Sequence, residues 1–122
     1  MKLLTIFLSL FFISISSFAQ TPDPKVSVAG HSDGSVTKAE LVSQEKLIPG
    51  SNDIIIISFT MSYPIGEDDF VELASNSDKL TSEMKENIKK VKVGTDITFE
   101  NIKAKRGDKT LILEAIIIKI KE

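Results

Sequence analysis

The sequence has no cysteine, no tryptophan and a single histidine, His31, and only eight of its 122 residues are aromatic. Without cysteine, neither disulfides nor a cysteine-linked lipid anchor can form, so stability has to come from packing. With one histidine, any metal site would have to be built from oxygen ligands. We expect no cofactor and no metal site.

A long apolar run is also missing. The longest runs from Leu3 to Ile15, about thirteen residues, whereas a membrane-spanning helix needs about 20. Lys2 precedes it and the small-residue stretch Ser16-Ser17-Phe18-Ala19 follows, which is the order of a secretory signal peptide. We predict a signal peptide at residues 1–19, cleaved before Gln20, and no membrane span afterwards. The alternative, an uncleaved membrane anchor, would need a longer run.

A strong charge of either sign is absent as well. Removing residues 1–19 takes away one of the fifteen basic residues and none of the seventeen acidic ones, which leaves a formal charge of −3. Nucleic-acid binding usually needs a basic patch with exposed aromatics. The mature part has only four aromatic residues, and its lysines alternate with acids. We therefore expect no nucleic-acid partner.

Residues 20–122 have the length of one domain. Thr37 and Glu40 have the spacing of a capping box, which predicts a helix from Lys38 to Gln44. Thr81 precedes a second expected helix, from Ser82 to Val91. Its apolar stripe consists of Leu80, Met84, Ile88 and Val91.

The rest of the mature chain predicts strands joined by short turns. Residues 30–35 and 64–69 have turn composition. In the last strand, Ile116 and Ile118 fall on one face with Ile112 and Glu114, which is typical of a central strand. The expected strands are Lys25–Ala29, Asp53–Tyr63, Phe70–Ser75, Asp96–Lys103 and Leu111–Ile120. The predicted fold is mostly β (α+β): an antiparallel, β-sandwich-like domain of about six strands with two short helices.

Residues capable of chemistry are few and do not form a catalytic set. His31, Ser32 and Asp33 are adjacent, but a triad needs side chains that converge, and neighbours in a turn point apart. Glu67, Asp68 and Asp69 lack the alternating spacing of a calcium loop, so we interpret them as a solvated turn. We predict no catalytic, cofactor-binding or metal-binding residue and a non-enzymatic chain.

Two further patterns have ordinary structural explanations. Arg106-Gly107-Asp108 spells an adhesion tripeptide, but the same residues are common in hairpin turns. Lysines 85, 89, 90 and 92 are interrupted by Glu83 and Glu86, which is typical of a solvated helix surface.

Several spaced segments, in one order, resemble the C-terminal domain of the gliding-motility and type IX secretion protein GldM. They span essentially the whole mature chain, and none is a catalytic signature. The segments are Pro24–Gly30, Ser32–Val36, Lys38–Leu41, Phe59–Ser62, Ser75–Thr81, Met84-Lys85, Ile88–Val91, Gly94 and Phe99–Ala104.

The resemblance implies a periplasmic protein-interaction module. Full-length members of that family have an inner-membrane helix and several periplasmic domains; here a signal peptide and one domain are expected, so motor function does not carry over. The chain also departs from the family at His31, where lysine is typical, and in the strand from Leu111, which lacks a proline-containing stretch.

We therefore expect an exported, most naturally periplasmic protein that binds a protein partner of the cell envelope, accessory to secretion or gliding. An extracellular location is the alternative. The alternative functions are a small-ligand carrier or inhibitor with an apolar pocket between sheet and helix, and, third, an enzyme. The sequence leaves the partner, the binding surface and the oligomeric state open.

Overall fold

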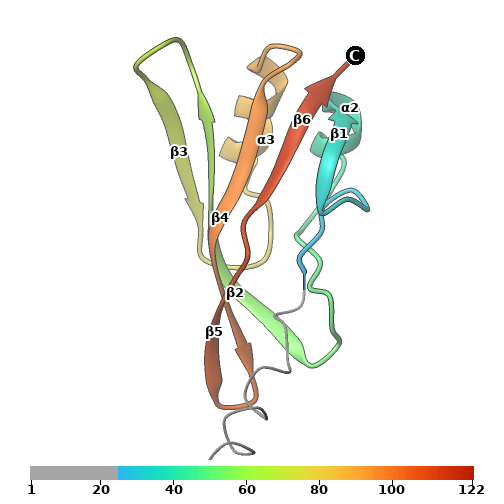
Figure 1. Cartoon of the computed structure of the whole chain (residues 1–122), viewed down its shortest axis with the longest axis vertical. Coiled ribbons are helices and arrows are strands. Elements are labelled where there is room, and N and C mark those ends of the chain that lie inside the picture. Colours follow the sequence, from blue (N-terminus) through green and yellow to red (C-terminus); the bar gives the residue numbers. More distant parts are fainter. Residues whose placement is uncertain (1–24) are drawn as a thin grey trace, which may run out of the picture.

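The computed structural model describes residues 25–122, which form one six-stranded sheet with two short helices (Figure 1). The elements are β1 (Asp33–Thr37), α2 (Lys38–Val42), β2 (Ile54–Pro64), β3 (Phe70–Ser75), α3 (Ser82–Lys90), β4 (Asp96–Arg106), β5 (Lys109–Leu113) and β6 (Ile116–Lys121). The mostly-β α+β class is confirmed. The predicted signal peptide and its cleavage site lie outside the described residues.

The strand order is β1-β6-β4-β2-β3, and β5 pairs with the far end of β4. Every pair is antiparallel except β1 with β6, which is parallel. The expected antiparallel sandwich is therefore corrected to a single mixed sheet across residues 25–122. A parallel pair needs a long connection, and the 78 residues between β1 and β6 (38–115) supply it.

Both helices begin where their capping residues predict. The Thr37 hydroxyl accepts a hydrogen bond from the Glu40 N–H, and the Glu40 carboxylate accepts one from the Thr37 N–H, each at 3.1 Å. This completes the capping box of α2. The Thr81 hydroxyl caps α3 by accepting from the Met84 N–H. No helix within residues 25–122 has the length and apolar character needed to cross a membrane.

The core lies between the helices and one face of the sheet. Met84 and Ile88 of α3 are fully buried, as is Leu41 of α2. The sheet contributes Phe59 and Phe99, whose ring centroids are 6.0 Å apart at a tilt of 58°. The apolar stripe predicted for the second helix, residues 80, 84, 88 and 91, is buried along its whole length.

The N-terminal prediction was wrong in two places. The expected strand Lys25–Ala29 makes only isolated bridges, from Ser27 to Ile48 and from Val28 to His31. Ala29 and Gly30 have positive φ and form the tight turn between those last two residues. The expected turn therefore ends early, and residues 33–37 form β1. Its partner β6 is distant in sequence, so local composition gave no sign of it.

Halfway along the sheet, the alternation of buried and exposed residues shifts by one residue, and it does so at the same level in neighbouring strands. Side chains on one face of a regular strand lie an even number of residues apart. At this level, however, one buried residue and the next buried residue of the chain are three apart. The pairs are Ile56 and Phe59 in β2, Phe99 and Ile102 in β4, and Leu113 and Ile116 across the gap between β5 and β6. The β2–β4 register shifts on both sides of Ser58, so both strands bulge there.

The same shift overturns the prediction of one continuous last strand. Leu111–Ile120 is divided at Glu114-Ala115 into β5 and β6, and Ile112 is exposed although Ile116 is buried. The register of both strands against β4 is the same, but the ladder is interrupted beside Asn101. Asn101 has a positive φ of 51°, which turns the β4 backbone away from regular pairing. The prediction that the last strand is central was right for its β6 half, which lies between β1 and β4, and wrong for its β5 half, which pairs with β4 alone.

Candidate binding notch at the end of the sheet

The sheet splits at the end where β2 finishes and β4 begins. The last β2–β4 pair is Ser62 with Thr98. Beyond it β2 continues with β3 alone, to the Pro64–Phe70 pair, and β4 continues with β6 alone, to Asp96–Lys119. Figure 1 shows the two arms diverging, with α3 behind the opening. Proline has no N–H to give to a ladder, so Pro64 explains why the pairing stops there.

The split leaves an open cleft of about 820 Å³, called the end notch below. One wall comes from the end of β2 and the turn after it, and the other from the start of β4. The end of α3 and the segment after it form the rest. The lining residues are Tyr63, Pro64, Ile65, Gly66, Lys90, Val91, Lys92, Gly94, Thr95 and Asp96.

The apolar part of the end notch includes both fixed and exposed side chains. Tyr63 and Val91 are buried, whereas Ile65 is 51% exposed. The Tyr63 hydroxyl donates to Asn87 Oδ1 of α3 at 2.8 Å, and burial raises the pKa of Tyr63. A neutral, hydrogen-bonded tyrosine thus anchors β2 to the helix. Phe70 and Val93, 62% and 54% exposed, flank the same end of the molecule, on the β3 arm and after α3.

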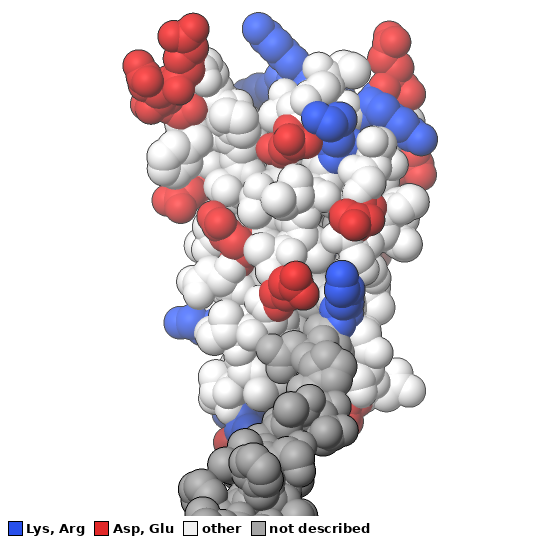
Figure 2. All heavy atoms as spheres, viewed as in Figure 1, with Lys and Arg blue, Asp and Glu red and all other residues white. Residues whose placement is uncertain are grey.

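The end notch has a cationic wall. Among the described residues, no ion pair engages Lys90 or Lys92, while neighbouring Lys89 pairs with Glu86 at 3.1 Å. Asp96, the one acid of the lining, already pairs with Lys119 at 3.1 Å. The exposed acids Glu67, Asp68 and Asp69 lie at the tip of the β2–β3 arm. Figure 2 shows acidic side chains gathered at that tip and basic ones at the top of the molecule beside it.

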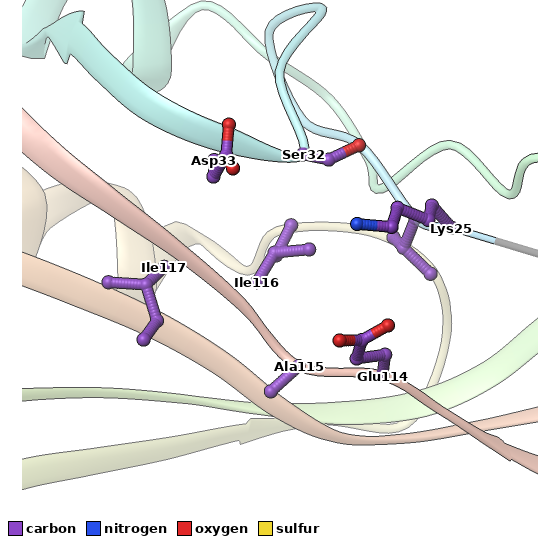
Figure 3. Close-up of a pocket in the computed structure, with 8 residues that line it drawn as sticks. Lys25, Ser32, Asp33, Glu114, Ala115, Ile116 and Ile117 are labelled. Atoms are coloured by element: carbon purple, nitrogen blue, oxygen red, sulfur yellow. The ribbon is translucent and has the colours of Figure 1, made fainter.

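A second, smaller hollow of about 160 Å³ lies where β5 gives way to β6. Figure 3 shows the side chains of Lys25 and Glu114 entering it from opposite sides, with Ser32 and Asp33 of the neighbouring segment close by. Its volume is well below the several hundred cubic ångströms typical of small-molecule sites. The hollow therefore follows from the interrupted strand and is a minor feature of the surface.

His31, Ser32 and Asp33 are neighbours in the chain, but their side chains do not form a catalytic array. His31 closes the turn after Gly30 and exchanges two backbone hydrogen bonds with Val28. Its side chain is exposed, and Asp33 already belongs to β1. Among the side-chain hydrogen bonds of residues 25–122, none involves His31, Ser32 or Asp33.

The other sequence candidates are dispersed. Glu67–Asp69 occupy the exposed β2–β3 turn, and in the described part of the chain no three acidic or histidine side chains are placed to hold a metal ion. The tip between β4 and β5 contains Arg106-Gly107-Asp108. Arg106 Nε lies 3.0 Å from Asp53 Oδ2, an ion pair whose N–H is not aimed well enough for a hydrogen bond.

Sequence reasoning missed the end notch although its parts were visible. Pro64 at the end of an alternating strand signals lost pairing on one side, and Gly94 marks where the helix exit returns to the sheet. Their juxtaposition depends on the β2–β4 register, which local patterns do not contain. The lysine pattern predicts a solvated helix surface; Lys90 and Lys92 are exposed, and they also line the notch.

No family model matches this chain, and no curated protein matches it significantly. The resemblance to the GldM C-terminal domain thus remains a prediction from the quoted segments.

Proposed function

We propose that this chain is a non-enzymatic protein-interaction module of the bacterial cell envelope. It is exported by its signal peptide and resembles the GldM C-terminal domain. Its role is to dock, without a motor of its own, on a protein partner of the type IX secretion or gliding machinery. The periplasm is the compartment that fits this role.

The observation that carries the proposal is the end notch. It combines two strand arms without a common partner, an exposed isoleucine and two lysines with no ion pair among the described residues. Apolar surface rimmed by polar groups marks interaction sites on soluble proteins, and free strand edges are a common peptide-docking surface. Both features favour binding a protein over processing a substrate.

A small-ligand carrier or inhibitor is the second candidate, because 820 Å³ lies within the range of ligand sites. Such sites usually enclose most of the ligand within apolar walls. The end notch is open at the end of the sheet and has two lysines and an aspartate in its lining. The interior between sheet and helices, where a carrier pocket was expected, is filled by buried side chains such as Met84, Ile88 and Phe99.

The test is to express the full chain with its own leader and a C-terminal tag in the native bacterium, cross-link intact cells, and purify the tagged protein. We expect a product that begins at Gln20 and one or more envelope proteins in stoichiometric yield. A thermal-shift screen of envelope metabolites tests the second candidate in parallel. A processed protein that is recovered alone, and that a metabolite stabilises, would contradict protein docking.

A further inference from the structure

We infer that the end notch binds an extended segment of the partner protein, in which a carboxylate lies next to an apolar side chain. This rests on the proposed function, and it specifies both the surface and the chemistry of the partner. Three independent properties of the notch point to such a segment: its strand edges, its charge and its exposed apolar wall.

The strand edges favour an extended main chain. Beyond Ser62, β2 is paired only with β3, and before Thr98, β4 is paired only with β6. The facing sides of the two arms therefore have no ladder partner of their own in the described structure. Main-chain hydrogen bonds from an added strand supply affinity with little demand on sequence. The β4 arm supplies most of the main-chain partners for such a strand, because Pro64 in the β2 arm has a carbonyl but no N–H to give.

The charge favours a carboxylate. Lys90 and Lys92 line the notch from the end of α3 and the segment after it, and no acid among residues 25–122 is within ion-pair distance of either ammonium group. Asp96 is held by Lys119. Glu67–Asp69 lie at the tip of the β2–β3 arm, so we place the carboxylate on the α3 side of the notch, where it would meet Lys90 and Lys92. Charge complementarity of this kind selects partners and speeds association.

The apolar wall favours a neighbouring hydrophobic side chain. Ile65 lines the notch and is half exposed. Tyr63 and Val91 also line it but are buried, and the hydrogen bond from Tyr63 to Asn87 holds the tyrosine in place. Gly66 and Gly94, which also line the notch, have nothing within 4 Å of an added Cβ. These two positions leave room for a side chain of the segment.

The test uses a phage-displayed library of random nonapeptides, selected on the processed full-length protein. Enriched sequences are synthesised and their affinities measured by fluorescence polarisation. We expect sequences that combine an acidic residue with an apolar neighbour. We also expect at least tenfold weaker binding to the double variant K90E/K92E, because its two new carboxylates would repel the carboxylate of the peptide. Replacing the peptide's Glu or Asp by Gln or Asn should weaken binding to the original protein and remove the difference between the two proteins.

The matched control is K103E/K105E, which reverses two exposed lysines at the other end of β4. A second pair compares Ile65→Asp, directly after the end of β2, with Ile55→Asp, near its start; both isoleucines are exposed. Folding of every variant is checked by circular dichroism and thermal unfolding. Binding that is lost with K90E/K92E and Ile65→Asp but kept in both controls supports the inference.

Three results would overturn it: no enrichment over the unselected library, enriched peptides without acidic residues, or equal loss in the notch and control variants. These outcomes can be distinguished from failure of the proposed function. An envelope protein that still co-purifies with K90E/K92E and Ile65→Asp leaves the interaction module intact and assigns its docking to another surface.

Discussion

At the scale of single residues, Asn101 shows how one backbone conformation shapes the sheet. It has a φ of 51° in the middle of β4, beside the point where the ladder to β5 and β6 is interrupted. Asparagine tolerates this left-handed region, glycine prefers it, and β-branched residues avoid it. The bulge lets Phe99 and Ile102, three residues apart, both be buried.

Substitution of Asn101 should therefore follow backbone preference and not hydrophobicity. We expect Asn101→Gly to leave the free energy of unfolding nearly unchanged and Asn101→Ile to lower it by about 1–3 kcal/mol. Isoleucine would suit a regular strand better than asparagine does. Urea unfolding of the three proteins checks this, and an isoleucine variant as stable as the original would show that the bulge is not required.

Neighbouring isoleucines of β6 provide a test of which face is buried. Ile118 is fully buried and Ile117 is 51% exposed. We expect Ile118→Ala to destabilise the domain by about 2–5 kcal/mol and Ile117→Ala to change stability by less than about 0.5 kcal/mol, as is usual for surface positions. Chemical denaturation measures both, and similar losses at the two positions would contradict the assigned orientation of β6.

At the scale of elements, the sequence predicted best those that depend on local chemistry. The Thr37 and Thr81 caps, the buried stripe of α3 and the strand Phe70–Ser75 were all visible, because each depends on residues close in sequence. The parallel β1–β6 pair and the break between β5 and β6 were not, since they depend on partners far along the chain. The end notch belongs to this second group, because only the β2–β4 register brings Pro64 and Asp96 to opposite walls of one cleft.

The capping box of α2 gives a prediction about pH. Hydrogen bonds from the Thr37 backbone and hydroxyl lower the pKa of Glu40. Because this folded-state pKa lies below the unfolded value, the contribution to stability is complete above the unfolded pKa and is lost as pH falls through the folded pKa. We expect Glu40→Gln to reduce stability at neutral pH and to remove part of its acid dependence. Unfolding midpoints between pH 7 and pH 3 check this, and parallel pH curves for the two proteins would exclude the cap as the cause.

Removing the Thr37 hydroxyl, the other half of the capping box, tests the cap without a change of charge. Thr37→Ala deletes the hydroxyl that receives the Glu40 N–H, and loss of an N-cap costs about 0.5–2 kcal/mol. Thr37→Ser, which keeps the hydroxyl, is the matched control. Thermal unfolding should rank the original and serine proteins together above the alanine variant; equal stability of all three would mean that α2 is held by Leu41 packing alone.

At the scale of the whole molecule, the domain is a single sheet that is covered on one face and splits into two arms at one end. Helices α2 and α3 cover the core face, the one-residue shift in the middle keeps apolar residues buried in both halves, and Pro64 separates the arms where the notch lies. This arrangement supports the proposal that the module holds a protein partner, and its export stays a prediction from the sequence.

Photo-cross-linking in intact cells tests that central claim most directly. A photoreactive amino acid replaces Ile65 in one strain and Ile55, at the opposite end of β2, in another. We expect one discrete protein adduct from position 65 after illumination and none from position 55. If neither these positions nor Phe70, Val93, Ile112 and Ile117, the other exposed apolar sites on strands or beside the notch, yield an adduct at native expression, the chain has no protein partner and the proposed function is wrong.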